Sequence, residues 1–270
     1  MLMQRIATAA VLLPLLIGAI WFLPTPQLYI VLSAAGLLVA WEWSGLCGWS
    51  SANHRIAYLV LITASLAFAW WVLDWWPWLN AVACTGWLIA LYAVLFPDAL
   101  LNQRLSPTAM AVIGWMMLIP TLLSLAVVHA MAQGPWRLLF LFFIIFAADT
   151  GAYFAGRRFG RRKLAPQVSP GKSVEGAIGG LIAVGLITAL AGWLIFQPTS
   201  PAQWLVLFAL GQVVALFSVL GDLTESLFKR SSGVKDSGTI LPGHGGMLDR
   251  VDSLLAGAPV MALGLMLTGL

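Results

Sequence analysis

The sequence predicts an all-α integral membrane protein with about nine transmembrane helices. Hydrophobic residues make up 61% of the 270 positions, and charged residues make up only 9%. A soluble globular chain carries roughly 25% charged residues, so this chain has too few charges to cover a surface that faces water. Its apolar residues also fall into runs of roughly 20, the length that a helix needs to cross the hydrocarbon core of a bilayer.

The nine expected spans follow one another closely along the chain. We place them at residues 6–23, 28–46, 56–73, 79–96, 108–130, 138–155, 174–196, 202–222 and 251–269. The segment 74–78, which holds three tryptophans and a proline, is typical of a turn at the level of the lipid headgroups. We therefore expect this segment to be the turn between the third and fourth spans.

Basic residues predict how these spans are oriented. If the N terminus is cytoplasmic, thirteen of the fourteen Lys and Arg residues fall on the cytoplasmic side, and only Arg137 lies outside. Loops rich in Lys and Arg stay in the cytoplasm, so this distribution supports a cytoplasmic N terminus and an outward C terminus. The basic segment 156–163 is explained by the same rule and by attraction to anionic headgroups.

The charges divide the chain into two regions of one structural unit. Between Asp149 and Asp252 lie seven of the ten acidic residues and ten of the fourteen basic ones. We interpret residues 1–137 as transmembrane scaffold helices and residues 138–270 as the catalytic region with its cytoplasmic loops. The basic residues lie in loops between apolar runs and form no stripe on a folded surface, so a nucleic-acid partner is not expected.

Two polar groups stand out in the first half of the catalytic region. Asp149 lies inside an apolar helix, where a carboxylate costs a few kcal/mol unless it faces protein, water or a cation. Tyr153 follows four residues later and shares its helical face. Further on, Pro170 and Gly171 form an expected turn that presents Lys172 and Ser173 at the start of a helix. A helix N terminus with a lysine and a hydroxyl is a favourable place for a phosphate.

A second group of charges lies at the end of the eighth span. Asp222, Glu225, Ser226 and Lys229 follow the spacing i, i+3, i+4 and i+7, which places them on one helical face. Hard divalent cations such as Mg²⁺ bind carboxylate oxygens together with substrate phosphates, and basic side chains bind the remaining phosphate charge. This inventory indicates phosphoryl or nucleotidyl transfer, without identifying the nucleotide or the acceptor.

The polar segments after the eighth span resemble the phosphatidate cytidylyltransferase (CDP-diglyceride synthetase) family. Residues 226–230 read Ser-x-x-Lys-Arg, residues 235–238 read Lys-Asp-x-Gly, and residues 244–252 read His-Gly-Gly-x-x-Asp-Arg-x-Asp. Residues 149–153, 156–157 and 169–176 are also similar to the family. The resemblance covers about residues 150–255, whereas the N-terminal half matches only as a hydrophobic region with several spans.

The resemblance implies a reaction in which phosphatidic acid and CTP give CDP-diacylglycerol and pyrophosphate, with Mg²⁺ as cofactor. It also implies a homodimer in the cell inner membrane, with an active site that faces the cytoplasm. Asp222 and Asp249 map onto aspartates associated with the family's metal centre. The candidate catalytic residues are then Asp222, Asp249, Lys235, Asp236 and His244. The candidate substrate-binding residues are Tyr153, Lys172, Ser173, Ser226, Lys229, Arg230 and Arg250. Second choices for ligands or supporting groups are Asp149, Glu175, Glu225 and Asp252.

Two other functions remain open. A CTP-dependent lipid kinase, acting on a polyprenol for example, would share the membrane, the nucleotide and the metal, but would transfer the γ-phosphoryl group to an alcohol. The segment from Lys235 to Asp252 favours the cytidylyltransferase. A transporter would place its charges near the midplane, often in repeated broken helices. Here Asp149 is the only deep charge among the candidates and no repeat is visible, so transport is the less favoured alternative.

Overall fold

The structure is a computed structural model that describes residues 2–240, 243 and 245–270. Within the described part, eight helices are long and apolar enough to cross a membrane, which confirms the all-α membrane class. They correspond to the second through ninth expected spans. The first expected span falls on α1, whose apolar part in the described residues is Ala10–Phe22, so nine spans stay a prediction.

The helices and strands have the following bounds. The helices are α1 (Leu2–Phe22), α2 (Thr25–Leu46), α3 (Ala52–Trp71), α4 (Trp76–Leu95), α5 (Asp98–Asn102), α6 (Pro107–Ala130), α7 (Gly134–Phe159), α8 (Val174–Ile187), α9 (Trp193–Phe196), α10 (Pro201–Ser231) and α11 (Leu248–Thr268). The strands are β1 (Lys163–Ala165) and β2 (Ser169–Ser173). A 3₁₀ turn, Leu73–Trp75, joins α3 to α4 where the turn was predicted, and a π-helical turn, Thr188–Gly192, joins α8 to α9.

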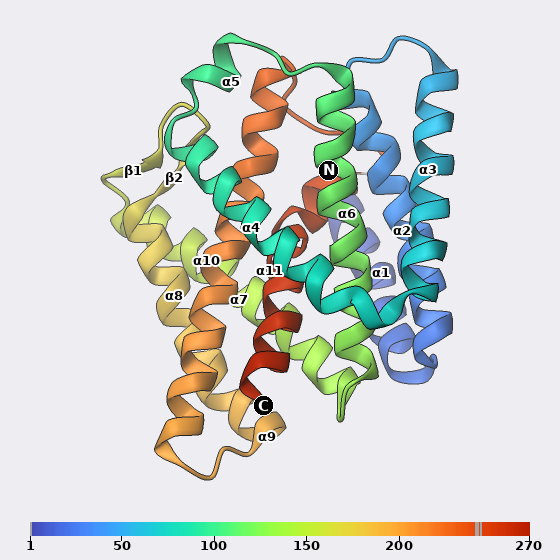
Figure 1. Ribbon diagram of the computed structural model, residues 1–270. Helices are drawn as coiled ribbons and strands as arrows, with labels where there is room; N and C mark the ends of the chain where they lie inside the picture. The colour runs from blue at the N-terminus through green and yellow to red at the C-terminus, as the bar shows by residue number, and fades with distance from the viewer. Residues whose placement is uncertain (1, 241–242, 244) are drawn as a thin grey trace.

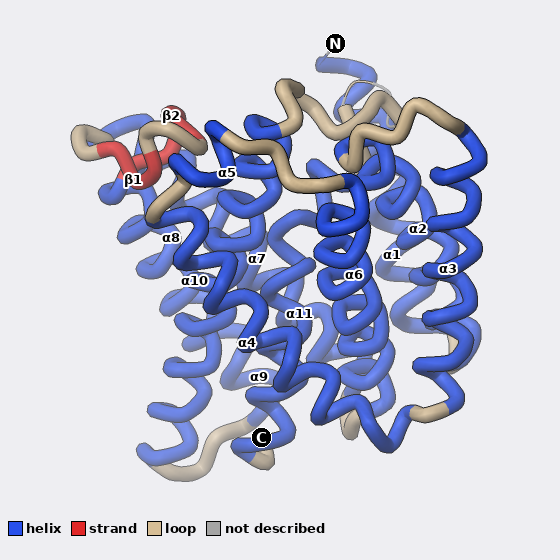
Figure 2. The backbone as a smooth tube through the Cα atoms, turned by 45° about the horizontal axis from the view of Figure 1, so that its top comes forward, coloured by secondary structure: helices blue, strands red, loops and turns tan. Residues whose placement is uncertain are grey.

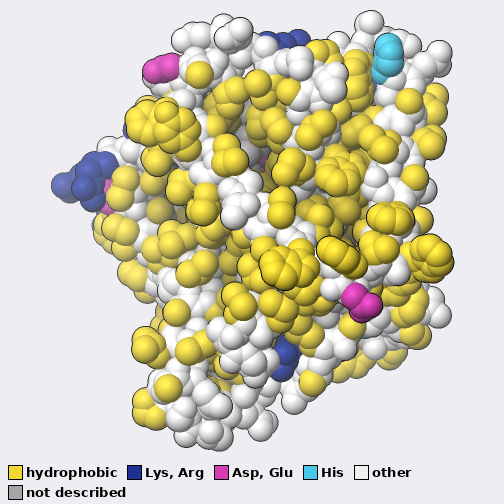
Figure 3. All heavy atoms as spheres, in the orientation of Figure 1, with side chains coloured by type: hydrophobic (Ala, Val, Ile, Leu, Met, Phe, Trp, Pro, Cys, Tyr) yellow, Lys and Arg dark blue, Asp and Glu magenta, His cyan; other side chains and the backbone are white. Residues whose placement is uncertain are grey.

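The long helices form one bundle with α11 in its middle (Figures 1 and 2). The loop after α2, the short helix α5 and the strands β1 and β2 lie at one end, whereas α9 and the C terminus lie at the other. The face drawn in Figure 3 is mainly hydrophobic, and the largest group of Lys and Arg side chains on it lies beside β1 and β2. The loops predicted to be cytoplasmic therefore share one end of the bundle.

A β-hairpin precedes α8, which the sequence did not predict. β1 and β2 pair antiparallel, with Lys163 opposite Ser173. The prediction of a turn at Pro170 and Gly171 is wrong, because both residues lie within β2. The helix does begin where it was expected: Ser173 is the N-cap of α8, and its Oγ accepts a hydrogen bond from the backbone N–H of Gly176 at 3.1 Å.

Glu175 explains why this segment folds back. Its Oε2 accepts hydrogen bonds from the backbone N–H groups of Arg161 at 2.9 Å and Arg162 at 3.1 Å, and its Oε1 accepts one from Arg162 Nε at 3.2 Å. The carboxylate in the first turn of α8 thus holds the chain that enters β1. Glu175 therefore stabilises the hairpin. Its contacts join two segments of the chain, so a sequence pattern does not reveal them.

Small residues let α7 and α8 approach closely. A Cβ atom added to Gly180 would lie 2.7 Å from the carbonyl oxygen of Ala148, and one added to Gly176 would lie 2.9 Å from that of Ala152. Within membranes, helix pairs associate through such close backbone packing, because lipid tails leave little hydrophobic driving force. This packing fixes the start of α8, and the hairpin before it, against the middle of α7.

We expect Gly180→Ala to destabilise the protein by about 1–3 kcal/mol, since the added methyl group overpacks the α7–α8 contact. Gly185→Ala is the matched control on the same helix, because its nearest neighbour, Gln212 Nε2, would be 3.8 Å from the new Cβ. Thermal unfolding of both variants in one detergent checks this. Equal unfolding temperatures for the two variants would contradict the close-packing argument.

Candidate active site

A cavity of about 460 Å³ lies where α7, the start of α8, the hairpin and α10 meet. Asp149 and Tyr153 line it from α7, Lys172 and Ser173 from the hairpin, and Asp222 from α10. These five predicted site residues come from segments separated by up to 73 positions, and the fold brings them around one space. Asp149 is an exposed residue that lines this cavity.

An ion pair crosses this cavity. Lys172 Nζ lies 2.6 Å from Asp222 Oδ2, and the two side chains are 27% and 29% exposed. Ser226, one turn further along α10, donates to Asp222 Oδ1 across 3.4 Å. Both side chains remain partly exposed to solvent. Lys172 can therefore leave Asp222 to bind an anionic ligand, and Asp222 can leave Lys172 to bind a cation. A phosphate would bind the ammonium, and a cation would bind the carboxylate.

Arg157 adds a second positive charge to the cavity wall. It lines the cavity, and its Nη1 donates to Tyr153 Oη at 3.1 Å. The sequence analysis interpreted this arginine as part of a basic topology signal and of a segment similar to the family, but did not choose it as a candidate site residue. Arg157 follows Tyr153 by one helical turn and shares its helical face. This spacing could have identified it from the sequence. The guanidinium and Lys172 together make the cavity suitable for a group with several phosphate charges.

A second cluster of charges lies between α10 and α11. Lys229 Nζ is 2.6 Å from Glu225 Oε2 and 2.6 Å from Asp249 Oδ1. The Glu225 side chain is only 1% exposed, and its Oε1 has no hydrogen-bond partner. One ammonium group therefore compensates two carboxylates inside the bundle. Unlike the Lys172–Asp222 pair, this cluster has little access to solvent, which indicates that it holds the two helices together.

Asp249 also organises the loop that precedes α11. Its Oδ2 accepts hydrogen bonds from Ser237 N at 3.2 Å, Ser237 Oγ at 3.0 Å and Gly246 N at 3.0 Å. With Lys229 on Oδ1, protein donors reach both oxygens of this carboxylate. Asp249 does not line the cavity of Asp222. In the structure its contacts fix the two polar segments 235–238 and 245–252 relative to each other.

Glu42 on α2 completes this arrangement, and sequence reasoning missed it. The side chain is 3% exposed, and its Oε2 accepts hydrogen bonds from Leu248 N at 2.8 Å and Ser237 Oγ at 3.3 Å. A Cβ atom on Gly238 would overlap Glu42 Oε1, and one on Gly246 would lie 2.7 Å from Glu42 Oε2. These two glycines therefore make room for a carboxylate of the protein itself.

The remaining predicted residues that the structure describes do not line the cavity. The Asp252 carboxylate accepts a hydrogen bond from Ser253 N at 2.6 Å, and the Asp252 carbonyl packs against Gly221, where α10 and α11 touch. Glu175 closes the hairpin. Four residues are exposed and do not line the cavity: Arg230, Lys235, Asp236 and Arg250. His244 falls outside the described residues.

The carboxylates of the cavity fit a magnesium ion that is shared with a substrate. In the described part of the chain, no group of three or more His, Cys, Asp or Glu side chains is placed to hold a metal ion alone. Mg²⁺ usually binds through one or two carboxylates plus substrate phosphates. Asp149 and Asp222 line the same cavity and supply that number. The predicted pairing of Asp222 with Asp249 stays a prediction.

Replacing Lys229 and replacing Lys172 should have different effects on the free energy of unfolding. We expect Lys229→Met to destabilise the protein by about 3–5 kcal/mol, since it leaves two buried carboxylates without a counter-charge. Lys172→Met is the matched control and should cost about 1 kcal/mol or less, because its ion pair is partly exposed. Thermal unfolding in detergent measures both. A larger loss in Lys172→Met would contradict the division into a structural and an accessible lysine.

Removing Glu42 should loosen the loop before α11. We expect Glu42→Ala to speed tryptic cleavage after the exposed Lys235 by about tenfold, since the Leu248 N–H and the Ser237 hydroxyl lose a buried charged acceptor worth about 1.5–3 kcal/mol per hydrogen bond. Glu42→Gln keeps an acceptor oxygen and should lie between wild type and the alanine variant. Cleavage rates that are equal in all three proteins would contradict this role.

Comparison with known proteins identifies the family of this chain. The model of the cytidylyltransferase family matches residues 3–268. A phosphatidate cytidylyltransferase of Pseudomonas aeruginosa is 37% identical over 266 residues, which cover 97% of this chain and 96% of the relative. One of Haemophilus influenzae is 37% identical over 286 residues, with 96% of each chain covered. One of Staphylococcus saprophyticus is 48% identical over 130 residues, about half of each chain. The chain belongs to the cytidylyltransferase family.

Proposed function

We infer that this protein is a nucleotidyltransferase that moves CMP from CTP to phosphatidic acid, giving CDP-diacylglycerol and pyrophosphate. The observation that carries this function is the cavity in which Lys172 meets Asp222 beside Asp149. It offers cationic groups for phosphates and carboxylates for a cation, within a bundle whose surface suits a lipid bilayer. The full-length relatives with the same activity in their names support this inference, and the lipid kinase alternative is not favoured.

The reaction needs positioning and charge neutralisation more than a strong base. A phosphate oxygen of phosphatidic acid, already anionic, forms a bond to the α-phosphorus of CTP. The bond from that phosphorus to the oxygen bridging the α- and β-phosphates breaks, and pyrophosphate leaves with the electron pair. Lys172 and Arg157 stabilise the phosphate charge in the cavity. Tyr153 holds the guanidinium of Arg157 by a hydrogen bond.

The proposed cofactor is Mg²⁺, held by Asp222 together with Asp149. The ion would neutralise charge on the phosphate oxygens during transfer. Asp249, the other metal ligand suggested by the resemblance, would act mainly through the loop that it orders, because Lys229, Ser237 and Gly246 already bind its oxygens. Ser173 caps α8 at the cavity wall and keeps its N terminus directed at the phosphates.

We also propose that the enzyme is a homodimer in the cell inner membrane, with the cavity facing the cytoplasm and without a nucleic-acid partner. The placement of the predicted cytoplasmic loops at one end of the bundle supports this orientation (Figure 2). CTP would then arrive from the cytoplasm and phosphatidic acid from the bilayer. The exposed residues Arg230, Lys235, Asp236 and Arg250 lie at the cytoplasmic side of this arrangement and remain proposed contacts for the nucleotide.

Labelled CTP tests the function. Purified protein in detergent, supplied with phosphatidic acid and Mg²⁺, should transfer the α-phosphate label into lipid and release the γ-phosphate label as pyrophosphate. Entry of the γ label into lipid would make the protein a kinase and would overturn the proposal. Absence of transfer from either position would do so as well.

Asp222→Asn should lower kcat by about a hundredfold, the loss typical of an impaired metal or phosphate site. Asp74→Asn is the matched control: Asp74 is exposed in the turn between α3 and α4, at the opposite end of the bundle from the hairpin, and its loss should leave kcat unchanged. The CMP transfer assay measures both variants. An Asp222→Asn enzyme with full activity would rule out the proposed role of this carboxylate.

A further inference from the structure

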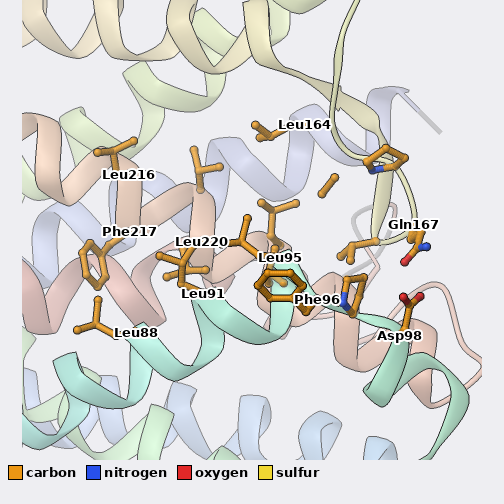
Figure 4. Close-up of a pocket in the computed structure, with 17 residues that line it drawn as sticks. Leu88, Leu91, Leu95, Phe96, Asp98, Leu164, Gln167, Leu216, Phe217 and Leu220 are labelled. Carbon is orange, nitrogen blue, oxygen red and sulfur yellow. The ribbon is translucent and has the colours of Figure 1, made fainter.

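An apolar groove of about 670 Å³ lies between α4 and α10 and is bordered by the turn of the β-hairpin. Leu88 and Leu91 of α4 lie opposite Phe217 and Leu220 of α10, and Leu216 lines the groove from the side of Leu164 (Figure 4). The groove ends toward the hairpin at Asp98 and Gln167, which lie close together in the same view. We call this space the α4–α10 groove.

The α4–α10 groove adjoins the charged cavity. Leu164 of β1 and Val219 of α10 line both spaces. On α10, Leu216, Leu220 and Leu223 form an apolar row with helical spacing, and Asp222 of the cavity lies between the last two in sequence. Leu164 and Val219 therefore separate the groove from the cavity, and a molecule with an anionic group at Lys172 would enter the groove beside these two side chains.

The dimensions of the groove match one leaflet of a bilayer. The row from Leu216 to Leu223 rises about 10 Å along the helix, and half of the hydrocarbon core measures about 15 Å. At this length the groove can hold about two thirds of a lipid chain from one leaflet and does not reach across the membrane. Its volume lies in the range of about 300–1,000 Å³ that is usual for small-molecule sites.

The charges at the two polar openings orient an anionic lipid. Asp98 at the hairpin end repels a phosphate, whereas Lys172 and Arg157 in the cavity attract it. We propose that the α4–α10 groove binds one acyl chain of the lipid substrate while its phosphate lies at Lys172. This inference rests on the proposed function and adds to it a binding site for the apolar part of the substrate.

The groove acts by positioning the lipid. A chain that leaves the bilayer for an apolar groove gains little from the hydrophobic effect, because lipid tails are as apolar as leucine. A chain held in the groove, however, fixes the attached phosphate relative to the cavity, and orientation of reacting groups contributes strongly to rate. The groove should therefore affect kcat/KM for substrates with long chains and leave those with short chains unaffected.

The proposal is tested by placing a larger side chain at the exposed edge of the groove. Leu216→Trp adds bulk at a lining residue that is 53% exposed, so the helix packing should tolerate it. Leu205→Trp is the matched control, since Leu205 is 72% exposed on the same helix and does not line the groove. CMP transfer is measured for both variants with dioleoyl and with dihexanoyl phosphatidic acid, using full-length protein in detergent.

We expect Leu216→Trp to lower kcat/KM for the dioleoyl lipid about tenfold relative to the dihexanoyl lipid, comparable to the discrimination of a modest apolar pocket. Leu205→Trp should leave the ratio of the two values at that of wild type. An unchanged ratio in an active Leu216→Trp enzyme would overturn the groove assignment alone. An unchanged ratio together with a loss of dimer would do the same and assign the groove to a second copy. A wild-type protein that transfers CMP to neither lipid would instead overturn the proposed function.

Discussion

The bridge that Lys229 makes between Glu225 and Asp249 holds the functional end of the bundle together. Inside a membrane protein an unpaired charge has no water to compensate it, so a buried carboxylate needs a cation or several hydrogen-bond donors. Lys229 supplies this for two carboxylates on two helices. Glu42 obtains the same compensation from Leu248 N and the Ser237 hydroxyl. Helices α2, α10 and α11 are thus joined at one level by polar contacts that lipid cannot replace.

In this arrangement one set of charged side chains stabilises the structure, and another set remains available to bind a substrate or a cation. Glu225 is buried against Lys229, and one turn earlier on the same helix Asp222 opens onto the cavity. The close packing of Gly180 against α7 holds the other wall of the cavity in place. The Lys172–Asp222 pair therefore stands on a rigid frame, which suits a reaction whose rate depends on the placement of phosphates.

Sequence reasoning predicted the spans well because each depends on a local apolar run of sufficient length. It also grouped Asp149, Lys172 and Asp222 as site residues, although their meeting in one cavity depends on the packing of α7 against α8. It failed for the hairpin, since Pro170 and Gly171 are typical of a turn and the pairing depends on Glu175 reaching back to Arg161 and Arg162.

Glu42 illustrates a different kind of miss, because its signal was present in the sequence. A carboxylate within the apolar run 28–46 is as unusual as Asp149 in its own helix, and the same argument about charges in membranes applies to both. All candidate site residues were chosen from the C-terminal half, where the polar motifs lie, so Glu42 was not among them. Its partners, Ser237 and Leu248, lie about 200 positions further along the chain, so only the fold could identify them.

The Lys172–Asp222 pair also suggests how binding of an anionic substrate and binding of a divalent cation depend on each other. With no phosphate present, each side chain satisfies the other across 2.6 Å. When Lys172 binds a phosphate, Asp222 loses its counter-charge, and a partly buried carboxylate in that state favours another cation. A cation at Asp222 in turn leaves Lys172 free for the phosphate. Binding of the anionic substrate and binding of a divalent cation should therefore strengthen each other, since thermodynamic coupling between two sites is reciprocal.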